Sequence, residues 1–165
     1  MRRSSNEIMG MTLLQHESER HKILLGNATM KFTVSVAAAA LQHMVPFTIE
    51  NPYTSLIWDA PSMKWLMART GISFVKADFC QYGAPWQKST RVVGGHLNLA
   101  SVARRCHRHK GLCSKSGRPR VALQGMYLSG VFNTALAEAY PATFSRAIAQ
   151  ALDNCGRALK GTAWQ

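Results

Sequence analysis

The sequence predicts an α/β fold with a mainly parallel sheet. Apolar residues at helical spacing alternate with short apolar runs typical of strands, which favours this fold, and an apolar share of 47% of the 165 residues excludes a compositionally disordered chain. A chain of this length can bury a real hydrophobic core. We expect a single domain over residues 1–165, because neither an internal repeat nor a low-complexity linker divides the sequence.

Four segments are expected within this domain. They are a weakly structured or helical lead-in at 1–26, core strands and helices at 27–95, a basic segment at 96–138 and a C-terminal helix at 139–159. In the lead-in, Thr12 and Gln15 form a possible capping box for a short helix, which Gly26-Asn27 would end or kink.

Apolar spacing places the remaining helices. Met30, Val34, Ala37, Leu41 and Met44 recur at three- and four-residue intervals and predict a helix that stops before Pro46. Further helices are expected at 62–70, ended by Gly71, near 98–105, and after Pro141. The last helix has the apolar stripe Phe144, Ile148, Leu152 and Cys155 and should stop at Gly156.

Short apolar runs place the strands. Residues 46–49, 72–76, 90–93 and 121–123 are the expected strands. The first strand ends in the polar break Glu50-Asn51-Pro52-Tyr53, and Tyr82–Pro85 is expected to be a loop.

Charge is distributed unevenly along the chain. Lys and Arg number 20 against 8 Asp and Glu, and no acidic residue occurs from Phe79 to Ala137. A stretch of one sign suits contact with nucleic-acid phosphates, although a solvated basic loop has the same composition. The candidate nucleic-acid-binding residues are Arg104, Arg105, Arg108, Lys110, Lys115, Arg118 and Arg120.

Several protein classes are not expected. No apolar run approaches the ~20 residues of a membrane-spanning helix, so no membrane partner is expected. The N-terminus lacks the apolar region of a secretory signal, and four cysteines are too few for a disulfide scaffold. We therefore expect an intracellular protein, cytoplasmic or nuclear.

Two short motifs indicate a ligand site. Glu50 follows an apolar strand, and ligands of open α/β sheets bind at the carboxyl ends of strands. A strand-end carboxylate that only caps a nearby backbone amide is the alternative. The second motif runs from Tyr82 to Gly94, where Lys88 and Arg91 flank the entry to a strand.

Together these motifs resemble the DNA cytosine-5 methyltransferase family, and most closely its divergent phage- and retroelement-like branch. That branch has Glu-Asn-Pro followed by Cys-x-Tyr-Gly-x-Pro-x-x-Lys-x-Thr. Here Glu50-Asn51-Pro52 matches the first part and 80–90 the second. The C-terminal Ala139-Tyr140-Pro141 before a helix is similar to the family's last motif. The resemblance covers roughly residues 27–152 in order.

The resemblance implies a role for each motif residue. In the family, a target base is flipped out of the duplex, a cysteine adds to its ring, and a Glu holds the ring nitrogen and exocyclic amine. Glu50 would take that role and Arg91 would contact the base carbonyl; these are the expected catalytic residues. Asn51, Pro52, Tyr53 and Lys88 are the expected substrate-binding residues.

The resemblance also implies a partial fold. It corresponds to part of a Rossmann-like methyltransferase sheet with flanking helices, lacking the N-terminal cofactor-binding half. No Gly-rich turn for S-adenosylmethionine and no Pro-Cys loop occur before Glu50, and Cys80 comes too late in the chain for the nucleophile. The family implies S-adenosylmethionine, but we expect no cofactor to be bound by this chain alone.

Three functions remain open. The first is a methyltransferase-like fragment, inactive alone, with Glu50 and Arg91 converging at one end of the sheet. The second is a non-enzymatic nucleic-acid-binding domain, with DNA favoured over RNA as the partner. The third is an interaction subunit whose sheet edge is completed by another chain or by a homodimer. Asn51-Pro52-Tyr53 is also partly similar to the Asn-Pro-Pro-Tyr of amino-group methyltransferases, but the Tyr82–Gly94 motif has no place in that family.

Metal binding is considered and not expected. Cys106, His109 and Cys113 are close in sequence and would need a remote fourth ligand, and their spacing fits no usual zinc finger. Cys155, Trp58 and Trp65 are expected to be core residues, although the two tryptophans can also wall a base pocket.

Overall fold

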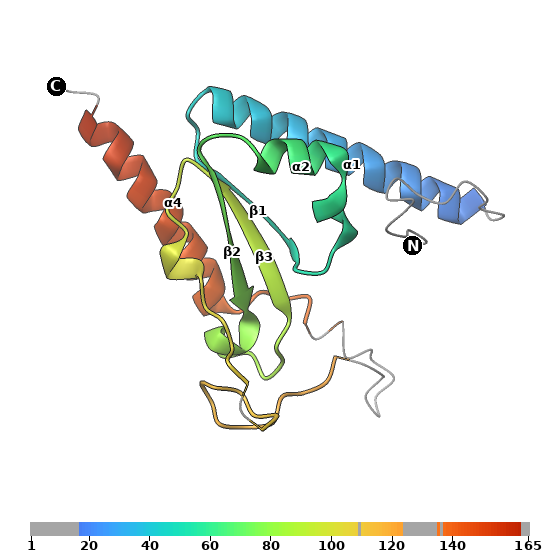
Figure 1. Ribbon diagram of the computed structural model, residues 1–165, viewed down its shortest axis with the longest axis vertical. Coiled ribbons are helices and arrows are strands. Elements are labelled where there is room, and N and C mark those ends of the chain that lie inside the picture. The colour runs from blue at the N-terminus through green and yellow to red at the C-terminus, as the bar shows by residue number, and fades with distance from the viewer. Residues whose placement is uncertain (1–16, 109, 124–134, 136, 163–165) are drawn as a thin grey trace.

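The computed structural model describes residues 17–108, 110–123, 135 and 137–162, and Figure 1 shows how their elements are arranged. The main elements are α1 (Glu17–Gln42), β1 (Phe47–Pro52), α2 (Pro61–Met67), β2 (Ile72–Asp78), β3 (Ser89–Gly95) and α4 (Ala142–Thr162). Three short 3₁₀ helices connect them: η1 (Leu56–Asp59), η2 (Phe79–Tyr82) and η3 (Ala100–Val102). The described chain therefore mixes helices and strands.

The sheet of the described residues has the order β1-β3-β2, and both pairings are antiparallel. The expectation of a mainly parallel sheet is wrong. Only residues 79–88 join β2 to β3, and a parallel crossover needs a dozen or more residues. β3 therefore turns back and inserts between β1 and β2, which run in the same direction as each other.

Side chains alternate between two faces of this sheet and enter two hydrophobic cores. Val92, Ala77 and Val75 lie on the face that packs against η2, η3 and α4. Val93, Ile49 and Phe47 lie on the face that packs against α1, η1 and α2. Helices thus cover both faces of the sheet, and the strand ends are left for the loops (Figure 1).

Helix α1 is longer than the sequence predicts. The expected apolar positions from Met30 lie within it, but it starts at Glu17 and passes through Gly26-Asn27 without a break. The expected boundary between 26 and 27 therefore falls inside a helix. Thr12 and Gln15 lie outside the described residues.

The outer surface of α1 is strongly apolar. Ile23, Met30, Val34 and Ala37 are buried, whereas Leu24, Leu25, Phe32 and Val36 are half or more exposed. By length and composition alone, α1 can cross a membrane, contrary to the expectation that no segment reaches that length. A core helix of a soluble protein passes the same test, but only 22% of this apolar stretch is buried, on the side of α1 that packs against α2 and the sheet.

The other predicted strands and helices fit in part. Three of the four expected strands correspond to β1, β2 and β3, each longer than expected, and the expected helix at 62–70 is α2. The helix ends at Met67 and not at Gly71 as expected, although Gly71 has φ of 84°, the left-handed conformation that favours glycine. Residues 121–123 form no strand, and the helix expected at 98–105 is only the turn η3.

Helix α4 begins directly after Pro141, close to the predicted start. Phe144, Ala147 and Ala151 are buried on the sheet, with Ile148 beside them. The helix continues through Gly156 to Thr162, so the expected stop at Gly156 is wrong. Six further residues of helix outweigh the cost of one glycine, which is about 1 kcal/mol.

Gly95 provides a test of this packing. A Cβ at Gly95 would lie 2.7 Å from Cζ of Phe47 on the neighbouring strand, closer than carbon atoms approach. We expect Gly95→Ala to lower the free energy of unfolding by about 1–3 kcal/mol, the usual cost of overpacking. Urea unfolding followed by circular dichroism measures it.

The matched control is Gly156→Ala, where a Cβ meets nothing within 4 Å in a helix. This change should stabilise the protein by about 1 kcal/mol. Equal stability of Gly95→Ala and the unchanged chain would show that the Phe47 ring moves aside freely, against the close packing described here.

Candidate functional site

Glu50 lies near the carboxyl end of β1, on the sheet face that packs against η2 and α4. The hydroxyl groups of Thr90 and Tyr140 both donate to its carboxylate, one to each oxygen. The Thr90 hydroxyl also lies 3.1 Å from the carbonyl oxygen of Asn51. The carboxylate is therefore held by side chains of β3 and of the segment before α4, rather than by a backbone amide.

Tyr140 covers Glu50 from the outside. Its side chain is 48% exposed, but its hydroxyl is turned toward the carboxylate. Burial of that hydroxyl and its hydrogen bond to Glu50 raise the pKa of Tyr140 to about 12. The phenol stays protonated at neutral pH and remains a donor to Glu50.

Lys88 lies on the same side of the sheet, next to this cluster. Its Nζ donates to the carbonyl oxygen of Ala137 at 2.8 Å. The same nitrogen is 5.2 Å from the Phe79 ring centroid and 5.6 Å from that of Tyr140. The structure thus brings Lys88 and Glu50 together through Tyr140.

Arg91 is on the opposite face. Asn51 is its partner in β1, so its side chain points toward α1 and α2 while that of Glu50 points toward α4. The guanidinium carbon lies 4.8 Å from the ring centroid of Tyr53 and 5.1 Å from that of Trp58. The expected convergence of Glu50 and Arg91 is wrong: the two share an end of the sheet but not a face.

The two tryptophans expected in the core differ in their exposure. Trp58 is 3% exposed and donates from Nε1 to the Pro52 carbonyl at 2.8 Å, which confirms it as a core residue. Trp65 is 47% exposed with Arg69 above its ring, so the core expectation is wrong there. The ring centroid of Tyr53 lies 4.8 Å from the guanidinium carbon of Arg91 and 4.7 Å from Nζ of Lys76.

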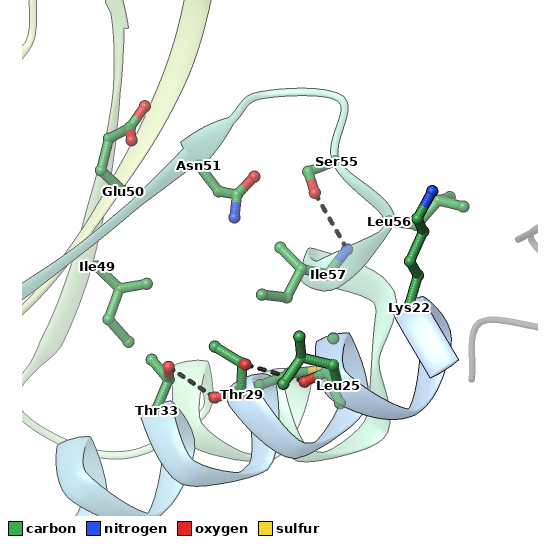
Figure 2. A pocket seen from close by; sticks show the side chains of 12 residues that line it. Lys22, Leu25, Thr29, Thr33, Ile49, Glu50, Asn51, Ser55, Leu56 and Ile57 are labelled. Atoms are coloured by element: carbon green, nitrogen blue, oxygen red, sulfur yellow. Dashed lines mark hydrogen bonds between the residues drawn. The ribbon is translucent and has the colours of Figure 1, made fainter. Parts of the chain in front are cut away.

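Asn51 points into a groove between α1 and β1. Figure 2 shows Ile49, Asn51 and Ile57 directed toward it, with Thr29 and Thr33 along its floor on α1. The groove has a volume of about 830 Å³. Both threonine hydroxyls donate to carbonyls of their own helix at 2.9 Å. The groove runs along the edge of β1 that faces away from β3.

The basic segment packs against the carboxyl end of β2 and the residues 79–88 that follow it. Arg108 and Arg120 both donate to the side-chain oxygen of Gln87, and Lys115 Nζ donates to the Gln81 carbonyl at 2.8 Å. The Arg104 guanidinium carbon is 4.7 Å from the Tyr82 ring centroid. Arg105, Lys110 and Arg118 are exposed. Most of the expected nucleic-acid-binding residues thus gather around 79–88, at the lower end in Figure 1.

Asp78, which the sequence analysis did not single out, anchors this arrangement. It is 1% exposed, accepts the hydroxyl of Ser89 on one oxygen, and accepts the backbone N–H of Cys106 on the other at 2.7 Å. The sequence does contain one indication of its role: Asp78 is the last acidic residue before the acid-free stretch from Phe79 to Ala137.

Three cysteines meet beside this anchor. The Sγ atoms of Cys80, Cys106 and Cys113 all lie within 4.8 Å of one another, and we call them the cysteine cluster. A metal site at Cys106 and Cys113 needs a further ligand from a distant part of the chain, and Cys80 is in the place of such a ligand. His109 lies outside the described residues. Cys155 is half-buried and its thiol donates to the His96 carbonyl at 2.6 Å, apart from the cluster.

Cys80 and Cys113 differ in the pKa of their thiols. Burial raises the pKa of Cys80 to about 12, and the neighbouring sulfurs add to the shift. Burial would also raise the pKa of Cys113, but backbone N–H groups of Ser116 and Lys115 donate to its sulfur and lower its pKa to about 6. A negative charge on the cluster is therefore held first at Cys113.

Comparison of the chain with protein-family models, with curated proteins and with solved structures finds no match.

Proposed function

We propose that this chain binds DNA at the carboxyl ends of β1 and β2 and is the target-base part of a methyltransferase-like domain. The observation that carries the proposal is the shared location of two features. The basic segment packs against the carboxyl end of β2, at the same end of the sheet as Glu50, and no acidic residue occurs between Phe79 and Ala137 to oppose a phosphate. Phosphate contacts provide affinity, and a carboxylate among them can select a base.

The Glu50 cluster has the chemistry for a flipped cytosine. A carboxylate accepts hydrogen bonds from an exocyclic amine and from a protonated ring nitrogen, and a half-exposed tyrosine offers a ring for stacking. Tyr140 occupies one carboxylate oxygen, so base binding requires it to turn outward, where almost half of its side chain already lies. Arg91 has no part in this step, because it lies on the other face.

The proposal concerns binding rather than methyl transfer. Within these 165 residues, no Gly-rich turn and no Pro-Cys loop precede Glu50. A Rossmann-like sheet would extend from the outer edge of β1, which pairs with no other strand among the described residues. The groove beside that edge and the exposed apolar residues of α1 favour completion by a further segment or chain, which would bring S-adenosylmethionine.

A DNA titration tests the proposal. Fluorescence anisotropy with a labelled duplex at several salt concentrations gives the affinity and its salt slope. Replacing Arg104, Arg108 and Arg120 together by glutamine should weaken binding and reduce the slope of log K against log salt by roughly 2 to 3, about 0.9 per lost phosphate contact. The matched control is Lys31→Gln with Lys64→Gln and Arg69→Gln, which removes equal charge from exposed positions on and after α1 and α2.

A second arm examines the base site. The probe is a duplex with cytosine opposite an abasic position, where flipping costs least, compared with thymine at the same place. We expect a preference for cytosine of about tenfold, within the range of one good base contact, and its loss in Glu50→Gln. Equal effects of the two triple variants would refute DNA binding at this end. Tight binding without a cytosine preference would leave a non-enzymatic DNA-binding domain.

A further inference from the structure

The cysteine cluster has the dimensions of a metal site. Cys106 and Cys113 have their sulfurs 3.9 Å apart, and Cys80 completes a triangle within 4.8 Å. Zinc with Zn–S bonds of about 2.3 Å in a tetrahedron separates its sulfurs by about 3.8 Å. A disulfide bond is about 2.05 Å long, and all four cysteines of the chain are free. The sulfurs are spaced as ligands of one ion, not as a bonded pair.

The segment that carries two of these cysteines has almost no hydrophobic core of its own. Between 103 and 119, every described side chain is exposed except the half-buried Cys106 and the buried Cys113. Polar segments that cannot bury apolar surface are commonly fixed by a metal or a disulfide. The cluster is where this segment reaches the folded sheet, because Cys80 belongs to η2 directly after β2.

Donor groups surround the sulfurs. The side-chain nitrogen of Gln81 is 3.8 Å from Cys80 Sγ and 3.6 Å from Cys113 Sγ, and the Ser114 hydroxyl is 3.7 Å from Cys106 Sγ. Donors of this kind orient metal-bound thiolates and spread their charge. The turn after Cys113 closes with Gly117 N–H bonded to the Cys113 carbonyl at 2.9 Å, with Gly117 at φ of 65°.

Three thiolates this close repel one another unless a cation lies between them. The buried sulfurs, at 3% and 2% exposure for Cys80 and Cys113, favour a structural ion over a catalytic one. Soft sulfur ligands select zinc, copper(I) or iron–sulfur clusters, and zinc is the one that structural sites with three cysteines and one nitrogen or oxygen donor hold.

We propose that Cys80, Cys106 and Cys113 bind one Zn²⁺ as thiolates, with a nitrogen or oxygen donor as fourth ligand. The ion fixes the basic segment to the carboxyl end of β2. The proposal does not depend on DNA binding, since it rests on the geometry, burial and neighbouring donors of the three sulfurs.

Metal analysis of the full chain tests it. The chain is purified in reductant without chelators, and its zinc content is measured by plasma mass spectrometry and native mass spectrometry. We expect one zinc per chain, lost in Cys80→Ser, Cys106→Ser and Cys113→Ser. The matched control Cys155→Ser changes a half-buried cysteine outside the cluster and should keep the zinc.

A measurement on the unchanged chain avoids the problem of misfolded variants. Replacing zinc by Co²⁺ should give thiolate-to-cobalt charge-transfer absorption and the strong visible bands of a tetrahedral site, and a mercurial reagent should release the ion as the thiols react. The proposal is overturned by an unchanged chain that binds neither ion stoichiometrically, by zinc retained in all three cluster variants, or by a Cys106–Cys113 disulfide in the same preparation.

Discussion

Replacing Phe79 by alanine should lower the free energy of unfolding by about 3–5 kcal/mol, the usual cost of removing a buried phenylalanine. Phe79 is 0% exposed and its ring centroid lies 4.9 Å from that of Phe144 and 5.9 Å from that of Tyr140. It joins the end of β2 to α4 and also packs under Lys88. Because domains of this size are stable by about 5–15 kcal/mol, a large part of the stability would be lost.

The control is the same substitution on β2, the strand that leads into η2. Phe74 lies on β2 and is 56% exposed, so Phe74→Ala should change the stability by about 0.5 kcal/mol. Phe79→Leu, which keeps most of the volume, should cost less than about 1.5 kcal/mol. Urea unfolding of the three variants measures these differences. A loss in Phe79→Ala as small as that in Phe74→Ala would contradict the packing between η2 and α4.

Replacing Asp78 by alanine is expected to cost about 3 kcal/mol. The change leaves the half-buried Ser89 hydroxyl and the Cys106 backbone N–H without their acceptor, and hydrogen bonds to a charged group are worth about 1.5–3 kcal/mol each. The effect should be local as well as global. Amide hydrogen exchange at Cys106 should accelerate in Asp78→Ala, because its only described acceptor is removed.

Two further variants serve as an intermediate case and as a control. Asp78→Asn keeps one acceptor oxygen and should lose roughly half as much stability. Asp59→Ala removes an exposed carboxylate whose ion pair with Lys64 spans 3.3 Å, and exposed pairs contribute about 0–1 kcal/mol. If Asp78→Ala and Asp59→Ala were equally stable, Asp78 would not anchor the basic segment.

The sequence predicts the strands of this fold better than their order. Apolar runs located β1, β2 and β3 because a buried strand must be apolar, whatever its direction. Direction depends on what joins the strands, and the short link between β2 and β3 was the signal that a parallel pair is impossible there. The sequence predicts a break in α1 at Gly26-Asn27, but one glycine lowers the stability of a helix by only about 1 kcal/mol, and the helix of 26 residues continues through it.

The site was predictable by residue type and not by geometry. Glu50 was identified because it ends an apolar run, but which face it shares with other residues depends on the pairing register, which a sequence alone does not provide. Asp78 and Cys80 illustrate the same limit. Each acts on Cys106, more than 20 residues away in the chain, and no local pattern marks such a contact.

The order of the strands has a consequence for how the protein is made. Among the strands of the described residues, β3 is the last to leave the ribosome and the central one, and within that sheet β1 and β2 pair only with it. Neither β1 nor β2 can form a sheet before β3 is present, so their backbone groups stay unpaired and can pair incorrectly until Gly95 has been translated. Sheet formation is therefore late and cooperative, and a nascent chain stopped before Ser89 has no strand ladder to close.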